Sequence, residues 1–177
     1  ASPAVRAASP RARRRLALSL VPVPLAGDCR GRKLRTPDVF LRPMMSRVRE
    51  ALFSMLYPTG VLRDSASSLD LFAGAGTVGI ECLSRGVGTA AFVDFSPKCT
   101  QTIRENLETL GLNERGRAVQ ASVFDVLLKP ESFGLTEPFD LVTMTPPYEE
   151  VVYADLMDAL AASPLLVEDT MLVIEVR

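Results

Sequence analysis

The residues from Asp70 to Gly79, DLFAGAGTVG, decide the fold that this sequence predicts. An apolar run from Leu69 to Phe72 breaks into three glycines with the spacing G-x-G-x-x-G, and a helical pattern follows. Glycines let a backbone pass close to a bound group, and a helix N-terminus offers free N–H groups with a partial positive charge. The stretch therefore predicts a strand, a ligand-binding turn and a helix. The glycines are Gly74, Gly76 and Gly79.

The alternation of strand and helix continues through the rest of the chain. We expect four further strands, at residues 90–93, 118–121, 139–144 and 171–176. We expect helices between them, at residues 97–110, 123–128 and 151–161. Ser96 and Gly111 are expected to cap the first of these helices. The pattern predicts an α/β fold with a doubly wound, mostly parallel sheet, whose ligand site lies beyond the carboxyl ends of the strands.

Composition limits the remaining choices. The chain has 177 residues, 47% of them apolar, which is enough for one domain with its own core. It contains no histidine, which excludes catalysis by imidazole and any zinc site that uses histidine. Its three cysteines are not at metal-binding spacing, so we predict no metal site. No apolar run is long enough to cross a bilayer, so we expect no membrane association.

Charge is divided unevenly along the chain. Residues 1–50 hold 12 of the 20 Lys and Arg residues but only 3 of the 21 Asp and Glu residues. Residues 1–24 are rich in Ala, Ser and Arg, as organelle transit peptides are, and we expect them to be disordered. A secretory signal and a solvated basic tail are the alternatives. We expect residues 25–60 to form a basic lead-in segment and residues 61–177 to form the ligand-binding domain.

A helix is expected within the lead-in segment. Ser46 is expected to cap it, apolar residues recur at helical spacing from Val48 to Leu56, and Pro58 ends it. We expect this helix to show Arg47, Arg49 and Glu50 to water.

Two acidic residues narrow the choice of cofactor. Asp94 ends the second predicted strand, where it can accept hydrogen bonds from ribose hydroxyls, and NAD and S-adenosylmethionine both fit this far. Asp70 lies four residues before Gly74. There it can meet the positive sulfonium and amino groups of S-adenosylmethionine, directly or by ordering the turn, whereas it would repel a pyrophosphate. The sequence favours S-adenosylmethionine, and the alternative is a tight turn beside a surface acid.

A candidate catalytic tetrapeptide, Thr145-Pro146-Pro147-Tyr148, follows the fourth predicted strand. Two prolines fix the backbone and free carbonyl oxygens as acceptors for a substrate. Tyr148 offers a flat face on which a nucleobase can stack. The alternative is a proline loop packed by a tyrosine.

The order of the motifs DLFAGAGTVG, FVD and TPPY resembles the class I methyltransferases that alkylate exocyclic amines of nucleobases. The segments Arg30–Leu34, Leu41–Pro43 and Arg47–Phe53 are similar to the lead-in of the RsmD-type small-subunit ribosomal RNA guanine-N2 methyltransferases. The resemblance covers residues 25–177. It implies a Rossmann-like sheet, S-adenosylmethionine as cofactor, methyl transfer to guanine N2, ribosomal RNA or the small ribosomal subunit as partner, and a monomer. With the basic N-terminus it favours a chloroplast location, with the mitochondrion as the alternative.

The resemblance also assigns residues to the cofactor site: Asp70, Phe72, Gly74, Gly76, Gly79, Asp94, Ser122 and Val123. Ser122 and Thr145 depart from the family pattern, which usually has Asp or Asn at both places, and Asp125 is a substitute for the first. The Thr145 hydroxyl and the Pro146 carbonyl are expected to accept the hydrogens of the amine that is methylated. The family's sheet continues with two strands that we expect this chain to lack.

The basic lead-in segment is expected to contact RNA phosphates, and its alternative is an ordinary solvated face. The candidate contacts are Arg30, Arg32, Lys33, Arg42, Arg47 and Arg49. Other functions stay open at this point. They are a DNA adenine-N6 or protein glutamine methyltransferase, an NAD-dependent oxidoreductase, and an RNA-binding ribosome-assembly factor without turnover.

Overall fold

The structure is a computed structural model that describes residues 24–39, 44–147 and 152–175. Parallel strands form its centre. The strands of the described sheet are β1 (Ser67–Leu71), β2 (Thr89–Asp94), β3 (Gly116–Gln120), β4 (Leu141–Met144) and β5 (Met171–Ile174). Their order is β3-β2-β1-β4-β5, and every neighbouring pair is parallel. The predicted doubly wound α/β fold is confirmed.

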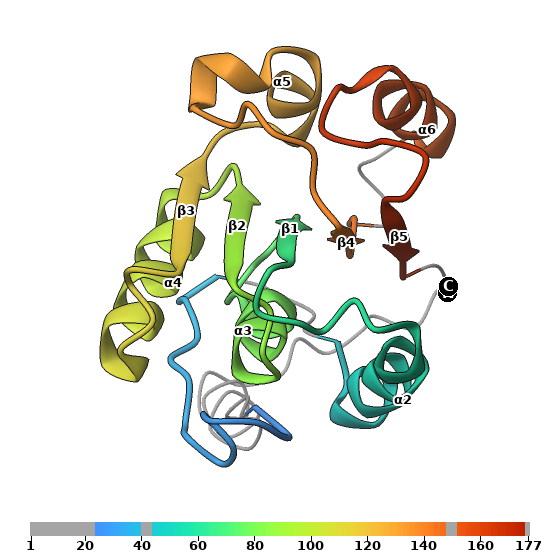
Figure 1. Cartoon of the computed structure of the whole chain (residues 1–177). Coiled ribbons are helices and arrows are strands. Elements are labelled where there is room, and N and C mark those ends of the chain that lie inside the picture. Colours follow the sequence, from blue (N-terminus) through green and yellow to red (C-terminus); the bar gives the residue numbers. More distant parts are fainter. Residues whose placement is uncertain (1–23, 40–43, 148–151, 176–177) are drawn as a thin grey trace, which may run out of the picture.

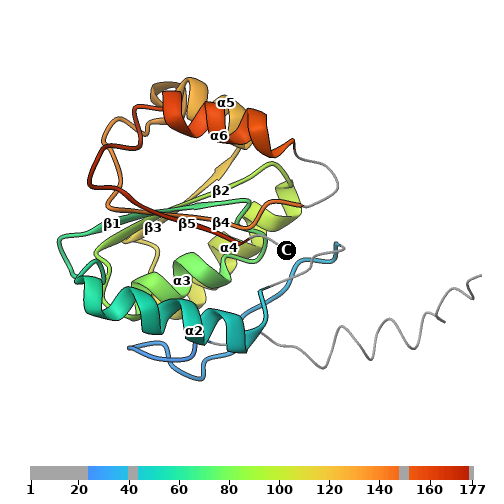
Figure 2. The same ribbon diagram turned by 90° about the vertical axis from the view of Figure 1, so that its right-hand side faces the viewer.

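Helices cover both faces of the sheet, as Figures 1 and 2 show. One face carries α5 (Val123–Leu128) and α6 (Tyr153–Ala162), and the other carries α2 (Ser46–Leu56), α3 (Thr77–Ser84) and α4 (Pro97–Leu110). The short 3-10 helices are η1 (Tyr57–Thr59) and η2 (Pro130–Phe133). Because both faces are covered, all residues of β4, an inner strand of the sheet, are buried.

The carboxyl ends of the strands meet at one edge of the sheet. Leu71 at the end of β1 pairs with Val93 on one side and with Met144 on the other. The direction in which strands are added reverses between β1 and β4, because β2 and β3 extend the sheet on one side of β1, and β4 and β5 extend it on the other. In open α/β sheets such a switch point is where ligands bind.

Most of the predicted elements are confirmed to within a few residues. Helix α4 has Ser96 at its N-cap, whose hydroxyl accepts the Cys99 N–H, and Gly111 at its C-cap with φ of 72°. The expected cap of α2 is wrong by one residue, because Ser46 is the first helical residue and Met45 occupies the cap position without a side-chain hydrogen bond. Residue 151, expected to begin α6, and residue 176, expected in the last strand, lie outside the described residues.

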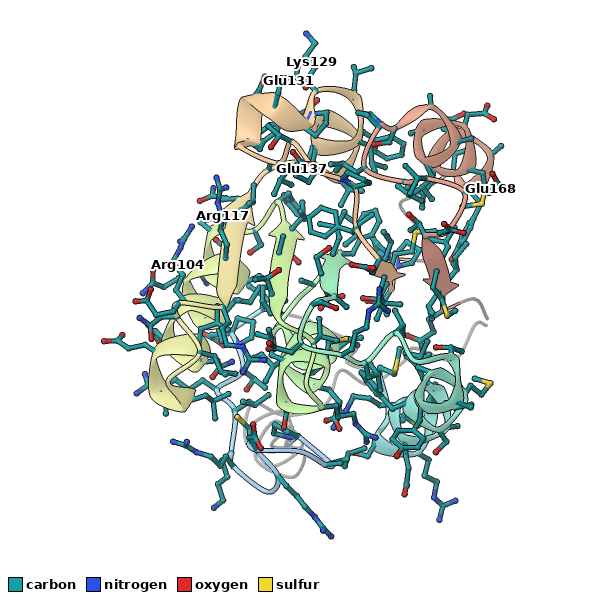
Figure 3. All side chains as sticks on the ribbon, in the orientation of Figure 1. Arg104, Arg117, Lys129, Glu131, Glu137 and Glu168 are labelled. Carbon is teal, nitrogen blue, oxygen red and sulfur yellow. The ribbon has the colours of Figure 1, made fainter. Side chains whose placement is uncertain are left out.

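Two arginines shield the outer strand β3. Arg104 of α4 donates to the Ala118 carbonyl, and Arg117 of β3 donates to the carbonyls of Phe133 and Gly134. Figure 3 shows both side chains at this border of the sheet. Charged side chains on an outer strand disfavour pairing with another chain. Within the described residues, no helix is long and apolar enough to cross a membrane.

Candidate functional site

The glycine turn joins β1 to α3 in a conformation that depends on glycine. Gly74 and Gly76 have φ of 56° and 76°, in the left-handed region, and Gly76 occupies the N-cap of α3. Phe72 also has a positive φ, 57°, and no other non-glycine residue in the described ranges does. A bulky residue held in this region is strained, and such strain clusters at functional sites. The turn that the sequence predicted is therefore present, and its strain begins two residues before the first glycine.

Asp70 lies beneath this turn and is 1% exposed. One carboxyl oxygen accepts the Gly79 N–H at 3.0 Å, and the other accepts the Thr143 hydroxyl at 3.0 Å. Burial raises the pKa of Asp70 to about 7, against the effect of these two hydrogen bonds. Because both oxygens serve the protein itself, the geometry favours the ordering role of Asp70 over direct contact with a cofactor.

Gly79, the third glycine of the motif, lies inside α3 and faces the sheet. A Cβ built on it would lie 2.4 Å from Cε1 of Phe92, which is 0% exposed. The glycine therefore lets α3 pack closely on β2, which is a packing role rather than a surface for a ligand.

Asp94 ends β2 and joins two turns at the carboxyl edge. Its carboxyl oxygens accept the N–H of Gly74 at 2.8 Å and the N–H of Ser96 at 2.9 Å. The next residue, Phe95, is 72% exposed although it is a large apolar side chain. Sequence reasoning missed Phe95, whose signal was an aromatic residue directly after the strand-ending acid.

Ser122 and Val123 follow β3 at the same edge. The Ala121 N–H bonds to the Asp94 carbonyl, which places this connection beside the end of β2. Ser122 is half-buried at the N-cap of α5 without a side-chain capping bond, whereas Val123 is 3% exposed and belongs to the core. Asp125 is exposed. Ser122 thus lies at the carboxyl edge of the sheet, while the Val123 side chain packs away from solvent.

Thr145 follows β4 and is bonded to the residue that follows β1. Its hydroxyl donates to the Phe72 carbonyl at 3.3 Å, and its N–H donates to the Leu71 carbonyl at 3.4 Å. Pro146 is buried and Pro147 is exposed, while Tyr148 lies outside the described residues. A hydroxyl whose proton is given to a carbonyl keeps its lone pairs as acceptors. The structure therefore places an acceptor against the strained end of the glycine turn.

The predicted RNA contacts of the lead-in segment divide into four groups, the last of which is the buried Arg49. Arg30, Lys33 and Arg47 are exposed as expected. Arg32 is also exposed, but its guanidinium donates to the Thr109 carbonyl at the end of α4. Arg42 lies outside the described residues.

Arg49 contradicts its prediction, because it is 1% exposed and cannot meet RNA or water. Its Nε lies 3.7 Å from Oε2 of Glu81, which is 0% exposed. Burial lowers the pKa of the Arg49 guanidinium from its ordinary value, and the Glu81 carboxylate opposes this change. The residue faces the core because it precedes Leu52, Phe53 and Leu56 by three, four and seven residues on α2.

Glu81 fastens the lead-in segment to the domain, a role that sequence reasoning missed. Its carboxylate accepts the N–H groups of Leu25 at 2.7 Å and Ala26 at 3.1 Å, and it pairs with Arg85 at 2.7 Å. One available signal was a lone acid within the otherwise uncharged helix α3.

Comparison with known proteins identifies the family. The model of the family described as Conserved hypothetical protein 95 matches residues 24–177. The ribosomal RNA small subunit methyltransferase D of Escherichia coli is 32% identical over 152 residues, which cover 85% of this chain and 72% of the relative. The chain belongs to the RsmD-type methyltransferase family.

Two further comparisons agree with this family in sequence and in fold. A putative rRNA methyltransferase of Bacillus subtilis, YlbH, is 34% identical over 160 residues, which cover 85% of this chain and 80% of the relative. The solved structure of a putative methyltransferase from Escherichia coli superposes with a TM-score of 0.64 at 30% identity, covering 85% of this chain and 74% of that one. The predicted class I methyltransferase fold is thereby confirmed.

The residues present fit S-adenosylmethionine, the methyl donor of RsmD-type enzymes. Asp70 lies beneath the turn, and a carboxyl group there suits a ligand with positive groups better than a pyrophosphate. Gly74 and Gly76 keep the turn free of side chains, and Asp94 lies where ribose hydroxyls are bound in this fold. In the described residues, no group of three His, Cys, Asp or Glu side chains could hold a metal ion.

Proposed function

We propose that this protein transfers a methyl group from S-adenosylmethionine to the exocyclic N2 of a guanine in small-subunit ribosomal RNA. The observation that carries the proposal is the hydrogen bond between Thr145 and Phe72. It joins the loop after β4, where the family resemblance puts the substrate base, to the turn after β1, where it puts the methyl donor. The names of the Escherichia coli and Bacillus subtilis relatives support ribosomal RNA as the substrate.

The chemistry needs positioning more than a strong base. The cofactor supplies a methyl group activated by a positive sulfonium. The amine of guanine would attack through its lone pair, so that the N–C bond forms as the methyl–sulfur bond breaks, S-adenosylhomocysteine leaves, and the proton lost from nitrogen passes to solvent. The amine is oriented when its N–H groups donate to fixed acceptors. The Thr145 hydroxyl is such an acceptor because its own proton is directed to the Phe72 carbonyl. This arrangement accounts for catalysis in a chain without histidine.

Asp94 and Phe95 are suited to the nucleoside part of the cofactor. Each Asp94 oxygen already accepts one backbone N–H and has a further lone pair for a ribose hydroxyl. The exposed face of Phe95 can stack an adenine ring, a contact worth about 1–3 kcal/mol for nucleobases on aromatic side chains. Ser122, at the end of β3, lies on the same edge of the sheet.

The RNA contacts that we propose are the exposed side chains of Arg30, Lys33 and Arg47, together with Arg32. Contacts of this type neutralise phosphates without reading sequence, so RNA affinity should fall steeply as salt rises. Arg49 is excluded from this set by its burial.

The decisive experiment is tritium transfer from labelled S-adenosylmethionine to small ribosomal subunits that lack the modification, followed by digestion to nucleosides. Labelled N2-methylguanosine is the expected product. Labelled N6-methyladenosine or labelled glutamine would contradict the proposed substrate. Cofactor binding by calorimetry with no label in RNA, DNA or protein would contradict catalysis and favour an assembly factor.

Substitutions in the tetrapeptide test the roles given to its side chains. Thr145→Val keeps the size of the side chain but removes the acceptor, so kcat should fall by about tenfold or more while the Kd for S-adenosylhomocysteine changes little. Tyr148→Ala should reduce turnover more than cofactor affinity, and Tyr148→Phe is the control that keeps the stacking face. Equal losses of turnover and cofactor affinity would contradict both roles.

We also propose that the protein is a monomer in a plastid, with the mitochondrion as the alternative. The transit-like composition of residues 1–24 supports an organelle. Light scattering of the purified protein tests the oligomeric state, and imaging of the full chain fused to a fluorescent protein tests the location.

A further inference from the structure

Asn106, in the middle of α4, holds two segments that are distant in the sequence. It is 2% exposed. Its Oδ1 accepts the Arg35 N–H at 2.8 Å, and its Nδ2 donates to the Arg35 carbonyl at 3.1 Å and to the Ala75 carbonyl at 3.2 Å. A single buried amide therefore contacts the lead-in segment and the glycine turn together.

The two hydrogen bonds between the Asn106 side chain and the Arg35 backbone take the place of bonds to a neighbouring strand. The described lead-in residues before α2 form no helix or strand, so their backbone groups need other partners when they pack on the domain. The amide of Asn106 satisfies both the N–H and the C=O of Arg35, as a neighbouring strand would. Removing it would leave both groups without that partner at a position that is partly buried by α4.

The bond to Ala75 reaches the centre of the glycine turn. Ala75 lies between Gly74 and Gly76 and is 5% exposed. Its carbonyl position is variable in principle because both neighbours are glycines with positive φ, which have wide conformational freedom. Asn106 thus selects one orientation of the peptide group inside the turn.

The side-chain amide is planar, so its three bonds are not independent. Both Nδ2 hydrogens and Oδ1 lie in one plane, and rotation of this plane to follow a displaced Ala75 carbonyl would disturb both bonds to Arg35. Residues 36–38, which come directly after Arg35, line an open groove with the first turns of α4. A displacement of the glycine turn would therefore also displace the lead-in segment and one wall of this groove.

We propose that Asn106 is a positioning residue that couples the glycine turn to the lead-in segment, so that cofactor and RNA raise each other's affinity. This rests on the proposed function, which puts the cofactor at the turn and RNA on the lead-in segment. A ligand that fixes the turn restricts Ala75 and, through Asn106, restricts Arg35. RNA then binds a segment that is already ordered, and less conformational entropy is lost. Coupling of this kind acts equally in both directions.

The test measures RNA affinity with and without S-adenosylhomocysteine, using the full chain and transcribed small-subunit ribosomal RNA at one salt concentration. In the wild type, saturating S-adenosylhomocysteine should tighten RNA binding by about fivefold or more. In Asn106→Ala this factor should fall towards one. Glu105→Ala is the matched control, because Glu105 is the preceding residue of α4 and pairs with the Arg35 guanidinium without contacting the turn. Glu105→Ala should change RNA affinity little, and S-adenosylhomocysteine should still tighten RNA binding by the wild-type factor.

A measurement on the wild type covers the case in which Asn106→Ala does not fold. Hydrogen exchange at Arg35, whose N–H is bonded to Asn106, should slow several-fold when S-adenosylhomocysteine is added. Unchanged exchange at saturation, or an equal coupling factor in the wild type and Asn106→Ala, would overturn the inference. These outcomes are distinct from failure of the proposed function, which is an absence of N2-methylguanosine in the transfer assay.

Discussion

Two buried carboxyl groups lie at opposite halves of helix α3, and they differ in the charge of their partners. Asp70 of β1 bonds to the amino-terminal half, and Glu81 belongs to the carboxyl-terminal half. At the amino-terminal half, Asp70 has neutral partners, the Gly79 N–H and the Thr143 hydroxyl, and its pKa is raised to about 7. At the carboxyl-terminal half, Glu81 pairs with the Arg85 guanidinium at 2.7 Å, with Arg49 at 3.7 Å. The acid of β1 that bonds to α3 therefore has a pKa near neutral pH, whereas the acid within α3 is paired with two arginines.

This difference shows that each half of α3 has its own role, one toward the glycine turn and the other toward the lead-in segment. The glycine turn lies above Asp70, which pairs with no cation among the described residues, so its ionised form would leave a negative potential available to a positive ligand. Glu81 faces the lead-in segment, where an ion cluster inside the protein fixes backbone N–H groups of residues 25–26. Burial by itself does not decide the role of an acid, because its partners set its charge.

The largest effect should follow from removing Glu81. Glu81→Ala leaves the buried Arg49 without its carboxylate and two backbone N–H groups without an acceptor, so the free energy of unfolding should fall by about 3–5 kcal/mol. Urea denaturation of both proteins measures the change. Glu108→Ala, at an exposed position on α4, is the control and should stay within about 0.5 kcal/mol. A loss as small as that of the control would show that the cluster does not anchor the lead-in segment.

A smaller effect is expected at the amino-terminal half. Gly79→Ala would place a methyl group against the Phe92 ring, and overpacking of this kind costs about 1–3 kcal/mol of unfolding free energy. Phe92→Leu removes part of the ring, so the double variant should lose less than the sum of the two single losses. Additive losses in the four-protein cycle would contradict the packing role of Gly79.

The smallest effect concerns the titration of Asp70. Its folded pKa, about 7, lies above its ordinary value of 3.8, so its stabilising contribution is complete below pH 3.8 and is lost as pH rises through about 7. Between pH 6 and pH 8 the wild type should lose about 1 kcal/mol through this group. Asp70→Asn keeps the shape without the charge, so its stability should depend less on pH over this range. Parallel pH profiles of the two proteins, from urea denaturation, would contradict the raised pKa.

The local elements could be predicted well because their signals are local. The caps Ser96 and Gly111 and the bounds of α5 agree with the sequence prediction, since capping and periodicity act within a few residues. Asp94 was placed correctly at a strand end, but the two turns that its carboxylate joins could not be foreseen. Arg49 was assigned to water because Arg is usually exposed, although its spacing on α2 matched the apolar face.

The sequence by itself determined the order of strands and helices, the glycine turn at the end of β1 and the family to which the chain belongs. Only the tertiary structure decided which acids and amides join distant segments. Glu81 meets the backbone 55 and 56 residues away, and Asn106 meets Arg35 71 residues away. Such contacts depend on how helices dock on the sheet, and buried polar groups take whichever partners that docking brings within reach.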